Sequence, residues 1–144
     1  NMGKNSSWDT HRRNFANLKD NLLPPLDKGM SALLDDMEAS GLLEDTLVIM
    51  AGEFGRTPKI NKDSGRDHWG PVNTMLFAGA GVEGGRVIGA SDRNGAEVID
   101  GLNTTENLAA TIFSTLGIPR DAHWEDMEGR PHRMYHARPI EGLI

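Results

Sequence analysis

Three short polar clusters contain the side chains that could do chemistry. They are residues 8–11 (WDTH), 52–57 (GEFGRT) and 65–70 (GRDHWG), and each lies at the boundary of an expected helix or strand. The sequence has no cysteine, which excludes disulfides, thiolate catalysis and thiolate-ligated metals. Neutral imidazole and carboxylate oxygen are the ligands that bind Zn²⁺, Mn²⁺ or Fe without cysteine. The clusters therefore predict a metal site built from nitrogen and oxygen donors.

Asp9, His11, Glu53 and His68 form a chemically adequate ligand set for a divalent metal. An Asp-x-His pair at the end of an element can direct both side chains at one ion. Zn²⁺, Mn²⁺, Ca²⁺ and Mg²⁺ all remain candidates. Such a metal polarises a phosphoryl or sulfuryl oxygen and lowers the pKa of bound water, so ester hydrolysis is the expected reaction class. Arg56 could add a bidentate contact to a tetrahedral oxyanion of the substrate.

Each candidate ligand also has a purely structural interpretation. Asp9 is a good helix N-cap, and His11 could be an ordinary residue of a first helical turn. Glu53 could pair with Arg56 in a loop, and His68 could simply be solvated. Taken alone, each residue is weak evidence, and the prediction rests on their combination.

A second histidine pair, His132 and His136, has the spacing of a helical metal motif. Pro131 and Pro139 disfavour one continuous helix there, because proline removes a helical hydrogen bond and clashes with the preceding turn. We therefore predict no metal site at these histidines.

Composition limits both the architecture and the partners. The 144 residues, of which 38% are apolar and 25% charged, predict one globular domain over residues 1–144. A formal net charge of −6 argues against nucleic acid and anionic membrane as partners. No apolar stretch approaches the ~20 residues needed to cross a bilayer, so a soluble chain is expected. An anionic substrate would need local positive charge, such as a bound metal.

The hydrophobic pattern predicts helices alternating with strands, which is typical of an α/β fold. Apolar residues recur at helical spacing from Leu26 to Met37, whereas residues 46–51 form a continuous apolar run typical of a strand buried on both faces. The expected elements are helices over 12–22, 25–40 and from Asn103 or Thr104 to Gly117, strands over 46–51 and 72–78, a hairpin of 86–89 with 96–99 across Asn94-Gly95, and an irregular tail over 120–144.

The order of these motifs resembles the C-terminal part of the alkaline phosphatase superfamily, which includes the sulfatases. Residues 46–55 resemble the strand and metal-binding loop of that superfamily, and residues 68–81 resemble its next block, in which a ligand histidine precedes a strand ending in a glycine-rich turn. Together, the WDTH, GEFGRTP and GRDHW motifs are most similar to a bacterial sulfatase-like branch described as a domain of unknown function.

The resemblance implies a mixed or parallel sheet flanked by helices, and a metal-dependent hydrolase of small phosphate or sulfate esters. Asp9, His11 and His68 would bind one metal, and Glu53 would reach a second. The superfamily nucleophile lies in an N-terminal half that has no counterpart in these residues, so the chain is expected to be inactive alone. Full-length relatives would be exported or periplasmic.

Two other hypotheses remain open. Where phosphatases have Asp-His and sulfatases often have Asp-Asn, this chain has Glu53-Phe54, which favours a non-catalytic α/β structural or interaction module with a degenerate metal site. In addition, an uncovered sheet edge would favour self-association into a homo-oligomer.

Overall fold

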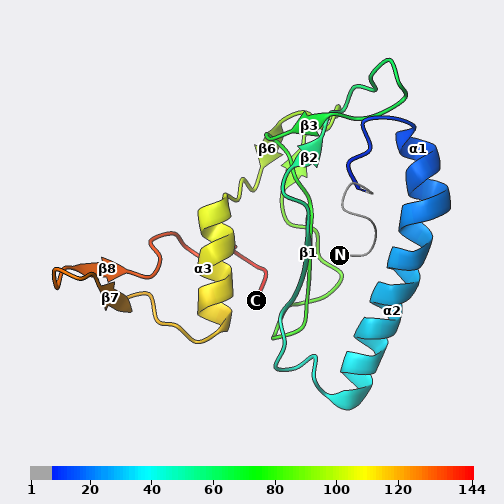
Figure 1. Cartoon of the computed structure of the whole chain (residues 1–144). Coiled ribbons are helices and arrows are strands. Elements are labelled where there is room, and N and C mark those ends of the chain that lie inside the picture. Colours follow the sequence, from blue (N-terminus) through cyan, green and yellow to red (C-terminus); the bar gives the residue numbers. More distant parts are fainter. Residues whose placement is uncertain (1–7) are drawn as a thin grey trace.

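The computed structural model describes residues 8–144, which form a mixed α/β structure of two helical rods and small two-stranded antiparallel sheets (Figure 1). One rod lies along one side of the molecule, all the sheets except the C-terminal one lie in the middle, and the second rod lies between them and that last sheet. The elements are α1 (Asn14–Asn17), η1 (Leu18–Leu22), α2 (Leu23–Ser40), β1 (Val48–Ala51), β2 (Gly55–Arg56), β3 (His68–Trp69), β4 (Met75–Ala78), β5 (Ala90–Ser91), β6 (Val98–Asp100), α3 (Thr105–Thr115), β7 (His123–Glu125) and β8 (Pro131–Arg133).

The first rod joins the two predicted N-terminal helices into one, because α1, the π-helical turn η1 and α2 follow without a break. Pro24 and Pro25 have no N–H group to continue the α-helical bonding. The turn before them widens instead, and the Leu23 N–H donates to the carbonyl of Leu18. The rod ends where predicted, at Gly41, whose φ of 77° is the left-handed conformation that glycine adopts most readily.

The main correction to the predicted fold concerns the sheet, which was expected to be mixed or parallel. β1 pairs with β4 in antiparallel register, with Val48 opposite Ala78 and Ala51 opposite Met75. All strand pairs among residues 8–144 are antiparallel. A parallel pair needs a crossover connection, usually a helix that covers the sheet. The chain between β1 and β4 forms no helix, and it carries only β2 and β3 before it returns.

Of the predicted elements that follow, the third helix is confirmed with shifted boundaries, whereas the first strand of the hairpin lies at Ala90–Ser91 and not over 86–89. The hairpin across Asn94-Gly95 pairs β5 with β6, and Gly95 has a φ of 69° in its turn. The third predicted helix is α3, which begins after Thr104. Asn107 closes a capping box with Thr104, which satisfies backbone groups that every helix N-terminus leaves unpaired.

Residues 120–144 contain more regular structure than the expected irregular tail. β7 and β8 form an antiparallel hairpin that projects away from the rest of the molecule (Figure 1). Asp126 closes its loop, because its carboxylate accepts hydrogen bonds from the backbone N–H groups of Glu128 and Arg130 and from the Arg130 side chain. Gly129 provides a positive φ of 74°. The remaining tail lies against α3, where the backbone N–H of Ile140 donates to the hydroxyl of Thr111, and Tyr135 donates a hydrogen bond to the Ile118 carbonyl just beyond the helix.

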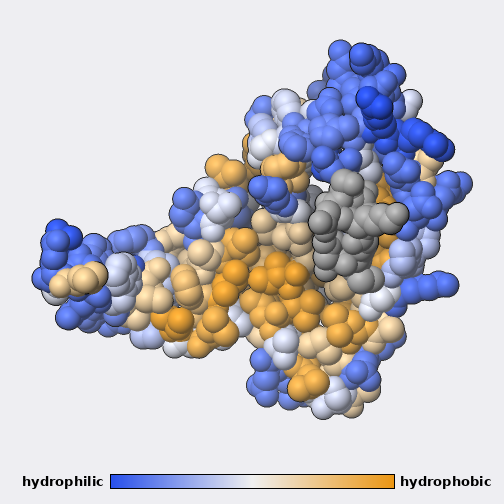
Figure 2. Space-filling view, viewed as in Figure 1, coloured by the Kyte–Doolittle hydropathy of each residue, from blue (hydrophilic) through white to orange (hydrophobic). Residues whose placement is uncertain are grey.

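The tertiary core is sparse over residues 8–144. Its buried apolar side chains are those of Leu22, Met37, Ala110, Tyr135 and Leu143. Figure 2 shows a broad apolar area on the middle of the visible face, between the two rods. None of the described helices combines the length and hydrophobicity that crossing a bilayer requires.

A seam of backbone contacts attaches the segment before α1 to the loop over residues 61–66. The N–H groups of Arg13 and Asn14 donate to the carbonyls of Asp63 and Ser64, and the Arg66 N–H donates to the carbonyl of Thr10. Gly65 lies so close to this segment that a Cβ atom there would be 1.9 Å from the carbonyl oxygen of His11. The absence of a side chain at Gly65 thus permits the contact.

We predict that Gly65→Ala destabilises the chain by about 1–3 kcal/mol, the usual range for overpacking a close contact. The atoms that the added methyl group meets are backbone, so a side chain cannot simply rotate away. The measurement is chemical denaturation. Gly70→Ala is the matched control, because a Cβ there meets nothing within 4 Å. Equal midpoints for the two variants would contradict a tight seam.

The β7–β8 hairpin is predicted to lose stability in acid. Hydrogen bonds from His132, and then from Arg130, lower the pKa of Asp126 from 3.8 to about 2. The stability that this carboxylate contributes is therefore present above about pH 4 and is lost as the pH falls through about 2. Asp126→Asn should remove it at all pH values and raise amide hydrogen exchange in the hairpin. Glu125→Gln, at an exposed position of β7, should leave exchange unchanged.

Candidate metal centre

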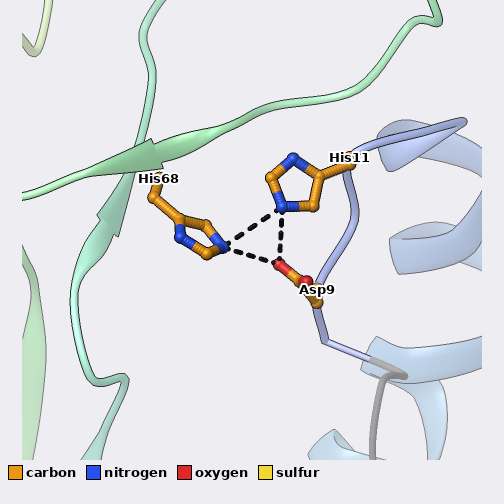
Figure 3. Close-up of side chains that lie close together, drawn as sticks. All are labelled: Asp9, His11 and His68. Carbon is orange, nitrogen blue, oxygen red and sulfur yellow. Dashed lines mark hydrogen bonds and ion pairs between the residues drawn. The ribbon is translucent and has the colours of Figure 1, made fainter.

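Asp9, His11 and His68 bring one ligand atom each to a single point (Figure 3). The Asp9 Oδ1 atom lies 3.1 Å from His11 Nε2 and 3.0 Å from His68 Nε2, and the two ring nitrogens are 3.2 Å apart. Asp9 and His11 precede α1, whereas His68 begins β3. The seam described above is what brings these two distant segments together.

The three donor atoms match the requirements of a divalent metal. Ligands about 2.0–2.2 Å from a common Zn²⁺ ion lie roughly 3–3.5 Å from one another, and the three distances agree with this spacing. Neutral imidazole together with carboxylate suits Zn²⁺, Mn²⁺ or Fe²⁺ better than the all-oxygen sites of Ca²⁺. The side chains are 41–50% exposed, so an ion and a small substrate could reach them. The residues form a possible Asp/His/His metal-binding group.

Asp67 orients His11, and sequence reasoning did not single it out as a functional residue. Its Oδ1 atom lies 2.6 Å from His11 Nδ1 and also accepts a hydrogen bond from the side chain of Asn61. These contacts, with His11 first and Asn61 second, lower the pKa of Asp67. A carboxylate that binds one ring nitrogen of a histidine leaves the other nitrogen available to a metal. Asp67 directly precedes the predicted ligand His68, which is a signal in the sequence. The sequence alone does not show which way the Asp67 side chain points.

Arg56 lies beside the cluster and pairs with one of its members. Its guanidinium is 2.7 Å from Asp9 Oδ1 and also donates to the carbonyl of Trp8 at 3.2 Å. Hydrogen bonds from His68, and then from Arg56, lower the pKa of Asp9 from 3.8 to about 2. Asp9 is therefore ionised near neutral pH, as a metal-binding carboxylate must be.

The loop that contains Glu53 delivers other side chains to the site. Glu53 lies in the bend after β1, is exposed, and is not a member of the three-residue group. The ring of Phe54 packs against that of His68, with centroids 4.1 Å apart, and Arg56 reaches Asp9. Gly55 allows the close approach of the loop to Val72, whose carbonyl oxygen would lie 1.7 Å from a Cβ at this position.

The histidines of the C-terminal hairpin lie outside the metal-binding group. His132 pairs with Asp126 at 3.0 Å and stacks on Trp124. These contacts give His132 a structural role within the hairpin.

Comparison with known proteins identifies the family. No curated protein and no solved structure matches the chain significantly. One family, described as "Protein of unknown function (DUF1501)", matches residues 2–144. The match covers the polar clusters at Asp9, Glu53 and His68 together with every described helix and strand. The chain therefore belongs to the DUF1501 family.

Proposed function

We propose that this chain forms part of a metal-dependent hydrolase of small phosphate or sulfate esters, and that Asp9, His11 and His68 bind one divalent ion. The observation that carries the proposal is the convergence of two Nε2 atoms and one carboxylate oxygen within 3.2 Å of one another. Three protein ligands are typical of a catalytic ion, because they leave a position for water or substrate, whereas a structural zinc usually has four.

The side chains around this group have complementary tasks. Asp9 contributes the negative charge that attracts a cation, and His11 is held by Asp67 with its Nε2 atom toward the cluster. Arg56 adds a fixed positive charge beside the group, where it would bind the oxygens of a tetrahedral anion. A bound divalent ion would supply Lewis-acid polarisation of the ester. Glu53 remains a proposed ligand of a second metal ion.

The likeness of the three motifs to the alkaline phosphatase superfamily supports the reaction class. By that likeness the chain corresponds to the C-terminal part of a sulfatase-like fold, and the nucleophile would be supplied by polypeptide outside these residues. The alternative is a non-catalytic module in which the same cluster is only hydrogen-bonded structure. Metal binding separates the two proposals.

We expect the chain to bind one equivalent of Zn²⁺ or Mn²⁺ and to prefer either to Ca²⁺, because two of the three donors are nitrogen. Isothermal titration calorimetry measures this directly. The double variant His11→Ala/His68→Ala should lose the binding, while His136→Ala, at an exposed position away from the cluster, should retain it. No binding by the parent chain, or unchanged binding by the double variant, would contradict the proposed metal site.

Removing the carboxylate that orients His11 should weaken binding without abolishing it. We expect Asp67→Ala to reduce Zn²⁺ affinity by about 10–100-fold, the usual effect of losing such an outer partner. Asp67→Asn should recover part of the affinity, because its amide oxygen can still accept a hydrogen bond from the Nδ1–H group of His11. The control is Asp35→Ala on the exposed side of α2. Wild-type affinity in Asp67→Ala would show that Asp67 does not position the ligand.

A further inference from the structure

Phe54 places an apolar ring against the polar side chains of the candidate metal centre. Its ring centroid lies 4.1 Å from that of His68, and the two ring planes are tilted by 40°. The guanidinium carbon of Arg56 lies 5.9 Å from the same centroid, within the range of a cation–π contact. His68 and Arg56 both bind the Oδ1 atom of Asp9, at 3.0 and 2.7 Å. Phe54 therefore contacts two side chains that meet at one ligand atom.

The paired strands β2 and β3 bring these side chains to one face. Arg56 and His68 are direct cross-strand partners, so their side chains lie on the same side of the ribbon. Phe54 precedes Arg56 by two residues, and side chains alternate along an extended chain, which returns Phe54 to that side. Gly55 between them has no side chain to keep the loop away from the carbonyl of Val72. The short sequence Phe-Gly-Arg thus delivers both the ring and the guanidinium.

The two histidines of the metal-binding group are oriented by different kinds of contact. Nδ1 of His11 lies 2.6 Å from the carboxylate of Asp67. His68 directs its Nε2 atom toward Asp9 and His11 (Figure 3), while its ring packs on Phe54. An imidazole that turns about its Cβ–Cγ bond sweeps through the space beside its faces, so a ring packed there restricts the turn. Half of the His68 side chain is exposed to solvent, which leaves the packed half to fix the ring.

We propose that Phe54 is a positioning residue for metal binding, whose ring holds the imidazole of His68 with its Nε2 atom toward the ion. A ligand that is already fixed loses less conformational freedom when the ion binds, so the affinity rises. The same ring supports Arg56 beside Asp9. This inference rests on the proposed metal function, and it gives Phe54 a task that a degenerate site would not require.

Titration of the parent chain and three Phe54 variants with Zn²⁺ and Co²⁺ tests this role. We expect Phe54→Ala to lower the Zn²⁺ affinity by about tenfold, the lower end of the usual effect of losing an outer partner of a metal ligand. Phe54→Leu keeps apolar volume without the flat ring and should also lose affinity, whereas Phe54→Tyr keeps the ring and should bind as the parent does. The visible absorption of bound Co²⁺, which reports coordination geometry, should change in the alanine and leucine variants only.

Phe113→Ala is the matched control, because Phe113 stacks on Tyr135 with ring centroids 5.7 Å apart and lies outside the metal-binding group. It should lower stability and retain the Zn²⁺ affinity and the Co²⁺ spectrum of the parent. Circular dichroism verifies the fold of each variant, and the comparison of Phe54→Leu with Phe54→Tyr does not depend on the folding of the alanine variant.

The possible outcomes separate the role of Phe54 from the metal site itself. Parent affinity and spectrum in Phe54→Leu as well as in Phe54→Tyr would overturn the positioning role and leave the metal site standing. Equal weakening by Phe113→Ala and Phe54→Ala would overturn it too, because loss of stability alone would then explain the effect. Absence of binding by the parent chain would contradict the proposed metal site, and this role with it.

Discussion

The backbone seam between residues 10–14 and 61–66 is the constraint on which the candidate metal centre depends. Asp9 and His11 are separated from His68 by almost half the chain, so closing that loop costs conformational entropy. Directional hydrogen bonds offset this cost, and Asn61 adds one from its side chain to the carbonyl of His11. Gly65 is essential to the contact, because any larger residue would push the two segments of the seam apart.

Short-range patterns predicted the local elements well and their pairing poorly. The helix end at Gly41, the turn at Gly95 and the cap at Thr104 each depend on residues within a few positions of each other. A short stretch of sequence is therefore enough to predict each of them. Parallel or antiparallel pairing depends on the path of the connecting chain. The continuous apolar run of β1 suggested a strand buried in a parallel sheet, but its side chains are mostly half-buried, and its last residue is exposed.

In the candidate site, likewise, the sequence indicated which residue types could bind a metal, but it could not indicate which way their side chains point. The sequence predicted Asp9, His11 and His68 from the combination of their motifs, since any of its 21 acidic residues and five histidines could bind a metal in principle. The structure brings the donor atoms of these three residues together. The same reasoning could not separate Glu53 from Asp67. Both are acids beside a ligand motif, and only the paired strands β2 and β3 determine that Asp67 reaches His11 while Phe54 and Arg56 replace Glu53 near the cluster.

The buried polar groups of the described residues find hydrogen-bond partners within the chain, whereas part of its apolar surface stays uncovered. Among the described residues, every buried side-chain nitrogen or oxygen has a hydrogen-bond partner, and the metal-binding group is held by contacts within one chain. The apolar face formed by α2, Met50 and Leu76 has no covering layer. Hydrogen bonds are directional and short-ranged, so a loop network can fix a site locally, whereas apolar burial requires area. The site geometry is therefore organised separately from this apolar face.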